Sequence, residues 1–240
     1  MGLRQWRLIR TMKSLVITSR NDFRIHSLLA PLKEIMEVGF LKQFDSQSVD
    51  DFGADIIFTD EIEKSPDGYD LKKISNVRPF INLLSYKDPL YLPKYESDVS
   101  YIGPISDMSS SLLDVYRLGY NVKNFFGSPS LLPCYSGSIP INECWSVYKS
   151  AKVSPIPKGD IGYRELDIIM AEGNPLKYTE KDEFIKEAIK GINGKKFKTI
   201  MSKSSIFSGH TNFDRLFQIL TDLGFSAIAK KIQQEKKCLA

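Results

Sequence analysis

Short apolar runs alternate along the chain with stretches of helical periodicity, and this alternation most limits what the chain can fold into. Each run is rich in β-branched or aromatic residues, as buried strands are. Alternation of this kind predicts an α/β protein with parallel sheets covered by helices. The runs expected to be strands are "SLVITS" (14–19), "FLKQFD" (40–45), "ADIIFTD" (54–60), "RPFINLLSY" (78–86), "VSYIGPIS" (99–106), "NVKNFFG" (121–127) and "KVSPIP" (152–157).

The pattern stops at "KDPLYLPKYESD" (87–98) and then starts again. We therefore expect an N-terminal extension (1–12), a small Rossmann-like domain (13–97) and a fuller Rossmann-like domain (98–240), facing each other across a cleft. In the first domain, we expect Gly39 to end the helix that follows the first strand. Near the C-terminus, Thr211 and Asp214 have the spacing of a capping box at the start of an amphipathic helix.

Composition excludes several classes of protein. The net charge of +4 is mild, the three cysteines form no CxxC pair, and the two histidines are far apart. A disulfide framework and a His-rich metal site are therefore not expected, and we expect no tightly bound metal. No apolar run approaches the length of a membrane span, and the first residues lack the apolar core of a signal peptide. We expect a cytoplasmic protein without a membrane partner.

Three loops follow strands of the second domain, and each has features of a ligand site. "GPISDMSSS" (103–111) runs into a helix N-terminus, where Gly103, Ser106 and Ser109 could hold a phosphate. An ordinary serine-capped helix explains this segment equally well. "SGSIPINECWSVYKSAKV" (136–153) presents main-chain groups near Ile139 to the edge of a base, or is a surface loop with a helix capped by Asn142.

The third loop leads into "IGYRELDIIMAEGNPLKY" (161–178). We expect a helix to begin there, with Tyr163, Arg164, Glu165 and Asp167 on its first turn. A carboxylate there can accept hydrogen bonds from sugar hydroxyls, and an arginine beside it can neutralise a diphosphate. The simpler explanation is helix capping with a local ion pair. The three loops lie at the same ends of neighbouring strands, so we expect them to cluster.

The order of "NFFGS" (124–128), "GSIP" (137–140), "YRELD" and "MAEGNPL" resembles the nucleotide-binding half of GT-B glycosyltransferases. The resemblance is to the phage DNA β-glucosyltransferases and, more loosely, to the CgeB-like glycosyltransferases, whose C-terminal helix is similar to "HTNFDRLFQIL" (210–220). It covers roughly residues 99–220. It implies that the "GSIP" loop contacts the base and that Arg164 and Asp167 hold the diphosphate and the ribose. A one-residue offset leaves Glu165 as the other candidate for the acidic role.

The resemblance also implies a catalytic base in the first domain. Asp88 is the first candidate, Asp60 the second, and Asp22 and His26 follow the first strand toward the same cleft. For each carboxylate, the alternative is a loop or capping residue, and for His26 a structural role in its helix.

The sequence thus predicts a GT-B-like glycosyltransferase that uses a nucleotide sugar, UDP-linked, with a modified base in DNA as an expected acceptor. The cluster Lys195–Lys198 with Lys203 is the candidate for phosphate contacts, or is a solvated surface. The competing prediction is a non-catalytic nucleotide-binding or interaction module of the same fold.

Overall fold

The computed structural model describes residues 12–18, 23–60, 66–74, 77–104, 108–126, 133–158, 160, 162–178 and 180–239. These residues form two parallel sheets of four strands each, with strand orders β2-β1-β3-β4 and β6-β5-β7-β8. The predicted α/β class with two Rossmann-like units is confirmed. The predicted cleft between the units stays a prediction.

The chain divides into two compact units, one of residues 1–84 with 210–240 and one of residues 85–209. This division differs from the predicted boundary near residue 97. The C-terminal helices belong to the first unit, because the backbone of Ile81 pairs with that of His210 and Asn212, at 2.9 and 2.8 Å. The side chain of Asn212, which is fully buried, also donates to Ser27 O at 3.0 Å.

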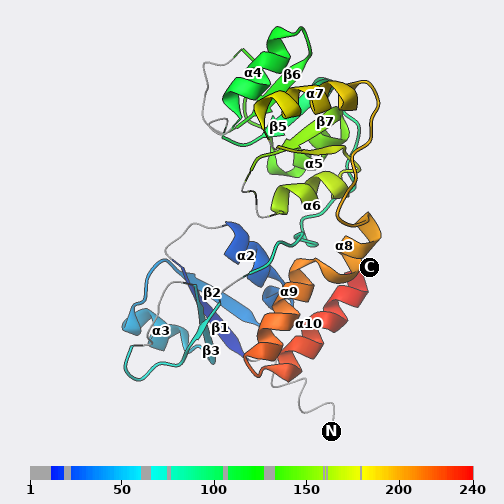
Figure 1. The fold of residues 1–240 in the computed structure, drawn as a ribbon. Coiled ribbons are helices and arrows are strands. Elements are labelled where there is room, and N and C mark those ends of the chain that lie inside the picture. Colours follow the sequence, from blue (N-terminus) through cyan, green and yellow to red (C-terminus); the bar gives the residue numbers. More distant parts are fainter. Residues whose placement is uncertain are drawn as a thin grey trace. The chain divides into compact units, whose positions relative to one another are not determined.

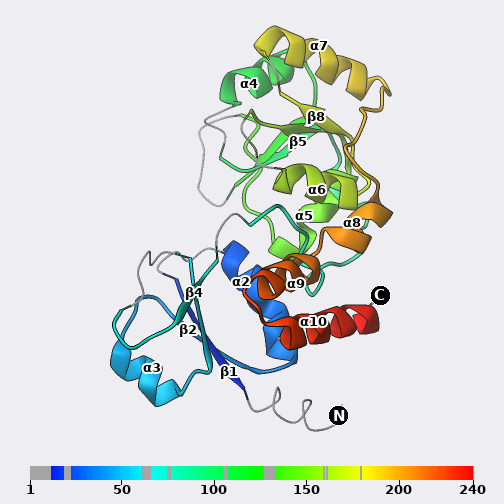
Figure 2. The ribbon, with the colours of Figure 1, turned by 60° about the horizontal axis from the view of Figure 1, so that its bottom comes forward.

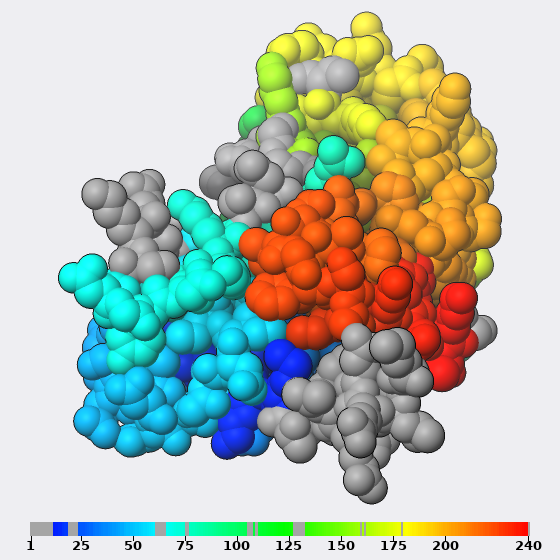
Figure 3. Space-filling view, turned by 90° about the horizontal axis from the view of Figure 1, so that it is seen from below, coloured from blue at the N-terminus to red at the C-terminus, as the bar shows by residue number. Residues whose placement is uncertain are grey.

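The first unit holds strands β1 (Lys13–Ile17), β2 (Glu37–Leu41), β3 (Ile56–Thr59) and β4 (Leu71–Lys73), with helices α2 (Phe23–Leu29), α3 (Ser46–Phe52), α9 (Asn212–Asp222) and α10 (Ser226–Leu239) and the 3₁₀ helix η1 (Ala30–Glu34). Leu15, Ile17 and Ile57 pack with Val49 of α3 on one face. Helices α9 and α10 pack on each other and on α2 and η1 (Figure 1). In Figure 3 the orange and red residues of these two helices lie against the blue and cyan residues of the same unit.

Two predictions for the first unit are wrong. Gly39 lies inside β2 and does not end a helix; a Cβ there would come within 2.9 Å of Leu15 and Phe52 side chains, so close packing requires the glycine. The helix ends earlier, at Leu29, where a 3₁₀ turn containing Pro31 begins. Residues 78–86 form only an isolated bridge, Ile81 with Thr211, and the sheet's fourth strand is the unpredicted β4.

The second unit holds strands β5 (Ser97–Ile102), β6 (Val122–Phe125), β7 (Ala151–Ile156) and β8 (Pro175–Lys177). Helices α4 (Ser109–Arg117) and α7 (Lys181–Ile192) cover one face of this sheet, and α5 (Cys144–Lys149) and α6 (Tyr163–Met170) cover the other (Figure 2). Helix α8 (Lys203–Gly209) packs on α6, and the 3₁₀ helices η2 (Pro93–Tyr95) and η3 (Ile141–Glu143) complete the unit. No helix that the structure describes has the length and apolar character needed to span a bilayer.

Helix ends follow local chemistry in most places. The capping box of Thr211 and Asp214 is present, with Thr211 N donating to Asp214 Oδ2 at 2.9 Å. Gly119 has a φ of +91° just after α4, as expected of a helix stop. The predicted cap by Asn142 is wrong, because α5 begins directly after the 3₁₀ turn that contains this residue, and its N-cap is Glu143 without a side-chain hydrogen bond.

Candidate functional site

The strands β5 and β7 stop pairing before they reach their carboxyl ends. Their register is Ser97 with Ala151 and Val99 with Val153, and the next pair in this register would join Tyr101 to Pro155. Pro155 has no N–H to donate to β5, so the ladder between β5 and β7 ends before this residue. On its other side, β7 pairs with β8. Strands β5 and β7 also flank the point where the connections leave the sheet in opposite directions. Open parallel sheets bind their ligands at this kind of switch point.

Gly103 directly follows β5 and brings main chain close to this point. Its φ is +138°, a conformation that favours glycine, and a Cβ there would lie 3.0 Å from Arg164 Nη2. The buried side chain of Asn124 fixes the strand end, since its Nδ2 donates to Tyr101 O at 3.2 Å and Gly103 O at 3.1 Å. Gly103 and Arg164 therefore lie close together, and the role of Gly103 at a ligand site stays a prediction.

Arg164 lies on the first turn of α6 and reaches over the end of β5. Its guanidinium carbon lies 4.5 Å from the ring centroid of Tyr101, and its Nε is 3.8 Å from Asp160 Oδ2. The side chain is 16% exposed, and Nη1 is buried without an acceptor among the described residues. A buried guanidinium that is not fully hydrogen-bonded retains donors for an anion.

Asp167 lies one turn after Arg164 on the same side of α6. Its Oδ1 accepts a hydrogen bond of 2.9 Å from Trp145 Nε1. Burial raises the pKa of Asp167 to about 6, although hydrogen bonding to Trp145 and the charge of Arg164 act in the opposite direction. A carboxyl group with this pKa sits beside an arginine, which is typical of ligand sites as well as of structural ion pairs.

Glu165 points elsewhere. It is 4% exposed, its carboxylate pairs with Lys177 Nζ of β8 at 3.1 Å, and its Oε1 is buried without a partner among the described residues. Residues three apart share a helix face and consecutive ones do not, which explains why Asp167 and not Glu165 accompanies Arg164. Asp167 is thus the carboxylate on the same helix face as Arg164, and its role in holding a ligand stays a prediction.

The remaining residues predicted to bind the ligand are Tyr163, Ser109, Ser106 and Ile139. Tyr163 begins α6 after Gly162, whose N–H donates to Asp160 Oδ1 at 2.8 Å. Ser109 begins α4, where the N-cap is Met108, and Ser106 lies outside the described residues. Ile139 is half-buried and packs on the apolar cluster of Tyr95, Phe125 and Val147, so its side chain has a packing role.

The predicted base Asp88 lies in the second unit and not in the first. Its side chain is 84% exposed, accepts a hydrogen bond from Tyr86 Oη at 3.0 Å and pairs with Lys203 Nζ at 3.3 Å. The hydrogen bonds from Tyr86 and Lys203 hold the pKa of Asp88 below its ordinary value. A carboxylate held in this way is a weaker base, and the catalytic role of Asp88 stays a prediction.

The other predicted bases belong to the first unit. Asp22 lies outside the described residues. The ring of His26 packs on that of Phe40 with centroids 4.5 Å apart, which is a structural contact. Asp60 follows β3, and its Oδ2 accepts a hydrogen bond from Thr18 Oγ1 at 3.3 Å. The buried Oδ1 of Asp60 has no partner among the residues that the structure describes.

Sequence reasoning missed the aromatic residues around Arg164. Tyr101 supplies the face on which the guanidinium lies, Trp145 holds Asp167, and Tyr148 is buried at 4% exposure close to both charges. Burial raises the pKa of the neighbouring Cys144 to about 11, so its thiol stays protonated and is no nucleophile at neutral pH. Tyr101 lies in a predicted strand, so the sequence could have indicated that it is buried. The sequence does not show that Arg164 lies against its ring.

No metal centre is evident in the part of the chain that the structure describes, where no three His, Cys, Asp or Glu residues come together in a suitable group. Comparison with known proteins adds no function, since no protein-family model matches the chain and the search of curated proteins gave no match.

Proposed function

We propose that the second unit binds the diphosphate of a nucleotide sugar at the carboxyl ends of β5 and β7, and that the protein transfers the sugar to an acceptor. The observation that carries this proposal is Arg164, a mostly buried cation at a helix N-terminus with an unused donor. It lies at the switch point of a parallel sheet, against Gly103, whose missing Cβ leaves room for the guanidinium. The resemblance to GT-B glycosyltransferases supports a UDP-linked donor.

In this reaction the bond between the anomeric carbon and the diphosphate breaks, and negative charge develops on the leaving group. Arg164 and the N-terminal N–H groups of α6 would stabilise that charge. Asp167, when ionised, would accept hydrogen bonds from ribose hydroxyls. The acceptor hydroxyl loses a proton, and an inverting reaction needs a base to take it. Asp88 and Asp60 are the carboxylates to test for this role, and one oxygen of Asp60 has no partner among the described residues.

A second candidate function is nucleotide binding without catalysis. The observation in its favour is Asp88, the first predicted base, which Lys203 and Tyr86 hold on the surface of the second unit. Binding and turnover separate the two candidates. Hydrolysis of the bound donor, or transfer of its sugar to DNA that carries a modified base, supports the enzyme. Binding of the nucleotide without either reaction supports the binding module.

Isothermal titration of the full chain with UDP and UDP-glucose tests the binding site. The change Arg164→Ala should weaken nucleotide binding about 10- to 100-fold, because a charge-assisted hydrogen bond is worth about 1.5–3 kcal/mol. The matched control is Arg117→Ala on α4, whose side chain is 68% exposed and pairs only at the surface, with Asp114 at 3.4 Å.

We expect the control to bind the nucleotide as the unchanged protein does. Circular dichroism should confirm that both variants remain folded. Equal affinity in the unchanged protein and the Arg164 variant, or the absence of binding by any nucleotide, would refute the proposed site.

A further inference from the structure

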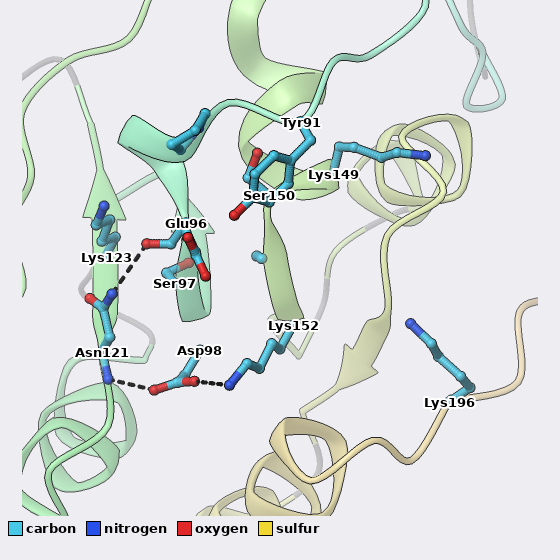
Figure 4. Close-up of a pocket in the computed structure, with 12 residues that line it drawn as sticks. Tyr91, Glu96, Ser97, Asp98, Asn121, Lys123, Lys149, Ser150, Lys152 and Lys196 are labelled. Carbon is cyan, nitrogen blue, oxygen red and sulfur yellow. Dashed lines mark hydrogen bonds and ion pairs between the residues drawn. The ribbon is translucent and has the colours of Figure 1, made fainter.

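A second groove lies at the opposite end of the same sheet. It has a volume of about 680 Å³ and is formed by the amino ends of β5 and β7, the residues before and within β6, the end of α5 and the loop after α7 (Figure 4). All of its lining residues belong to the second unit. Strand β5 has six residues at about 3.3 Å each, so roughly 20 Å separate this groove from Arg164. A single diphosphate cannot reach both places.

Four lysines from four segments line this groove. Lys123 comes from β6, Lys149 from α5, Lys152 from β7, and Lys196 from the loop after α7. Of the described lining residues, Glu96 and Asp98 are acidic. Because Lys149 pairs with Glu172 outside the lining, three lysines and two carboxylates remain, which leaves a local net charge of +1. Placing like charges around one concave surface is unfavourable unless a counter-charge occupies it.

The existing partners of these lysines leave room for such a counter-charge. Lys152 pairs with Asp98 at 2.8 Å, and Figure 4 shows these two side chains directed toward each other. Lys123 donates to the main-chain oxygen of Lys94 at 2.8 Å, which uses one of its three protons. Lys149 pairs with Glu172 outside the groove. Lys196 forms no ion pair with any residue that the structure describes.

We propose that this groove binds a small phosphate-bearing anion, independently of the site around Arg164. Lysine ammonium groups bind phosphate as mobile point charges, and the groove has the volume of a small-molecule site. Ser150 and Asn121 add polar groups to the lining. A nucleic-acid strand fits less well, because sequence-independent strand binding uses several stacked aromatic rings, and Tyr91 is the aromatic ring among the described lining residues.

The test uses inorganic pyrophosphate as the probe, titrated into the full chain by calorimetry at low ionic strength. The variant Lys196→Glu should weaken pyrophosphate binding about tenfold, since it reverses a charge at the groove. The matched control is Lys198→Glu, which changes the net charge equally at an exposed residue outside the groove lining. We expect pyrophosphate to bind this control as tightly as it binds the unchanged protein.

Equal weakening by both lysine variants would overturn the proposal, because it would show a response to net charge alone. Absence of pyrophosphate binding at millimolar concentration would also overturn it. The variant Arg164→Ala separates this proposal from the proposed function, because it should keep binding of pyrophosphate in the groove while its nucleotide binding is weakened. If Arg164→Ala abolishes pyrophosphate binding and Lys196→Glu has no effect, the groove proposal fails and the nucleotide site stands. Tighter binding of a short single-stranded oligonucleotide than of pyrophosphate, again weakened by Lys196→Glu, would contradict the small-anion assignment.

Discussion

The two units have the same sheet topology but different side chains at the ends of their strands. Both are four parallel strands in the order second, first, third, fourth, with a switch point between the first and third strands. In the second unit this point holds a mostly buried arginine, two carboxyl groups and a glycine with positive φ. In the first unit Asp60 and Thr18 occupy the corresponding strand ends. The shared topology therefore positions a site, but the side chains at the strand ends decide its chemistry.

The units also differ in how the chain builds them. Residues 85–209 form the second unit as one continuous segment, whereas the first unit combines residues 1–84 with 210–240. Its closing helices contribute large apolar side chains with exposed fractions of at most 4%: Phe213, Leu216, Leu220, Ile228 and Ile232. The first unit thus depends on the end of the chain for much of its core.

Removing residues 210–240 should have the largest effect on this comparison. Burial of each of these five side chains contributes about 1.5–3 kcal/mol, so their loss costs roughly 10 kcal/mol, as much as a domain's whole stability. We expect the shortened chain to lose one of two unfolding transitions in urea while the other remains, and the isolated segment 85–209 to fold and bind UDP. Retention of both transitions after the deletion would break the division into units.

A smaller effect is expected at Asp167, and it sharpens the contrast between the two switch points. Because the folded-state pKa of Asp167 is raised from 3.8 to about 6, the folded protein holds its proton more tightly than the unfolded chain does. Stability should therefore fall as pH rises from about 4 to about 6, by at most about 3 kcal/mol for two pKa units at 1.36 kcal/mol each. The variant Asp167→Asn cannot lose this proton and should show a flatter dependence.

Urea unfolding at about pH 4 and about pH 7 checks this expectation. A suitable comparison is Asp114→Asn on α4, because the hydrogen bond from Lys181 holds the pKa of Asp114 below its ordinary value. A lowered pKa contributes stability above it that is lost on acidification, so this variant should lose stability at neutral pH. Identical pH dependence in the Asp167 variant and the unchanged protein would show that Asp167 is not buried at the site.

Much of the fold could be predicted from sequence because buried parallel strands are short, apolar and rich in β-branched residues. The strands β1, β3, β5, β6 and β7 all have this pattern. Strand β4 was missed because "LKK" contains one apolar residue in three. The segment 78–86 was wrongly expected to be a strand of the sheet. Its Ile81 instead forms main-chain hydrogen bonds with His210 and Asn212 at the start of α9, far away in sequence. A local sequence pattern does not show which distant segments of the chain pair with each other.

The arrangement of the candidate site, like the fold, could be predicted only in part. The sequence predicted that Gly103 and Arg164 lie close together, because both follow strands and the carboxyl ends of parallel strands share one edge of the sheet. The choice between Glu165 and Asp167 required the helical phase of α6, which depends on where the helix begins. Asp88 was expected in the first unit because the boundary was predicted near residue 97, whereas it belongs to the unit of residues 85–209.

Hydrogen–deuterium exchange of the full chain, with and without saturating UDP, tests the central claim most directly. Ligand binding slows amide exchange where it stabilises the main chain. We predict protection in segments 97–104 and 162–170 of the second unit, and unchanged exchange in 13–18 and 56–60 at the matching strand ends of the first. Protection confined to the first unit, or no protection in either, would contradict the account.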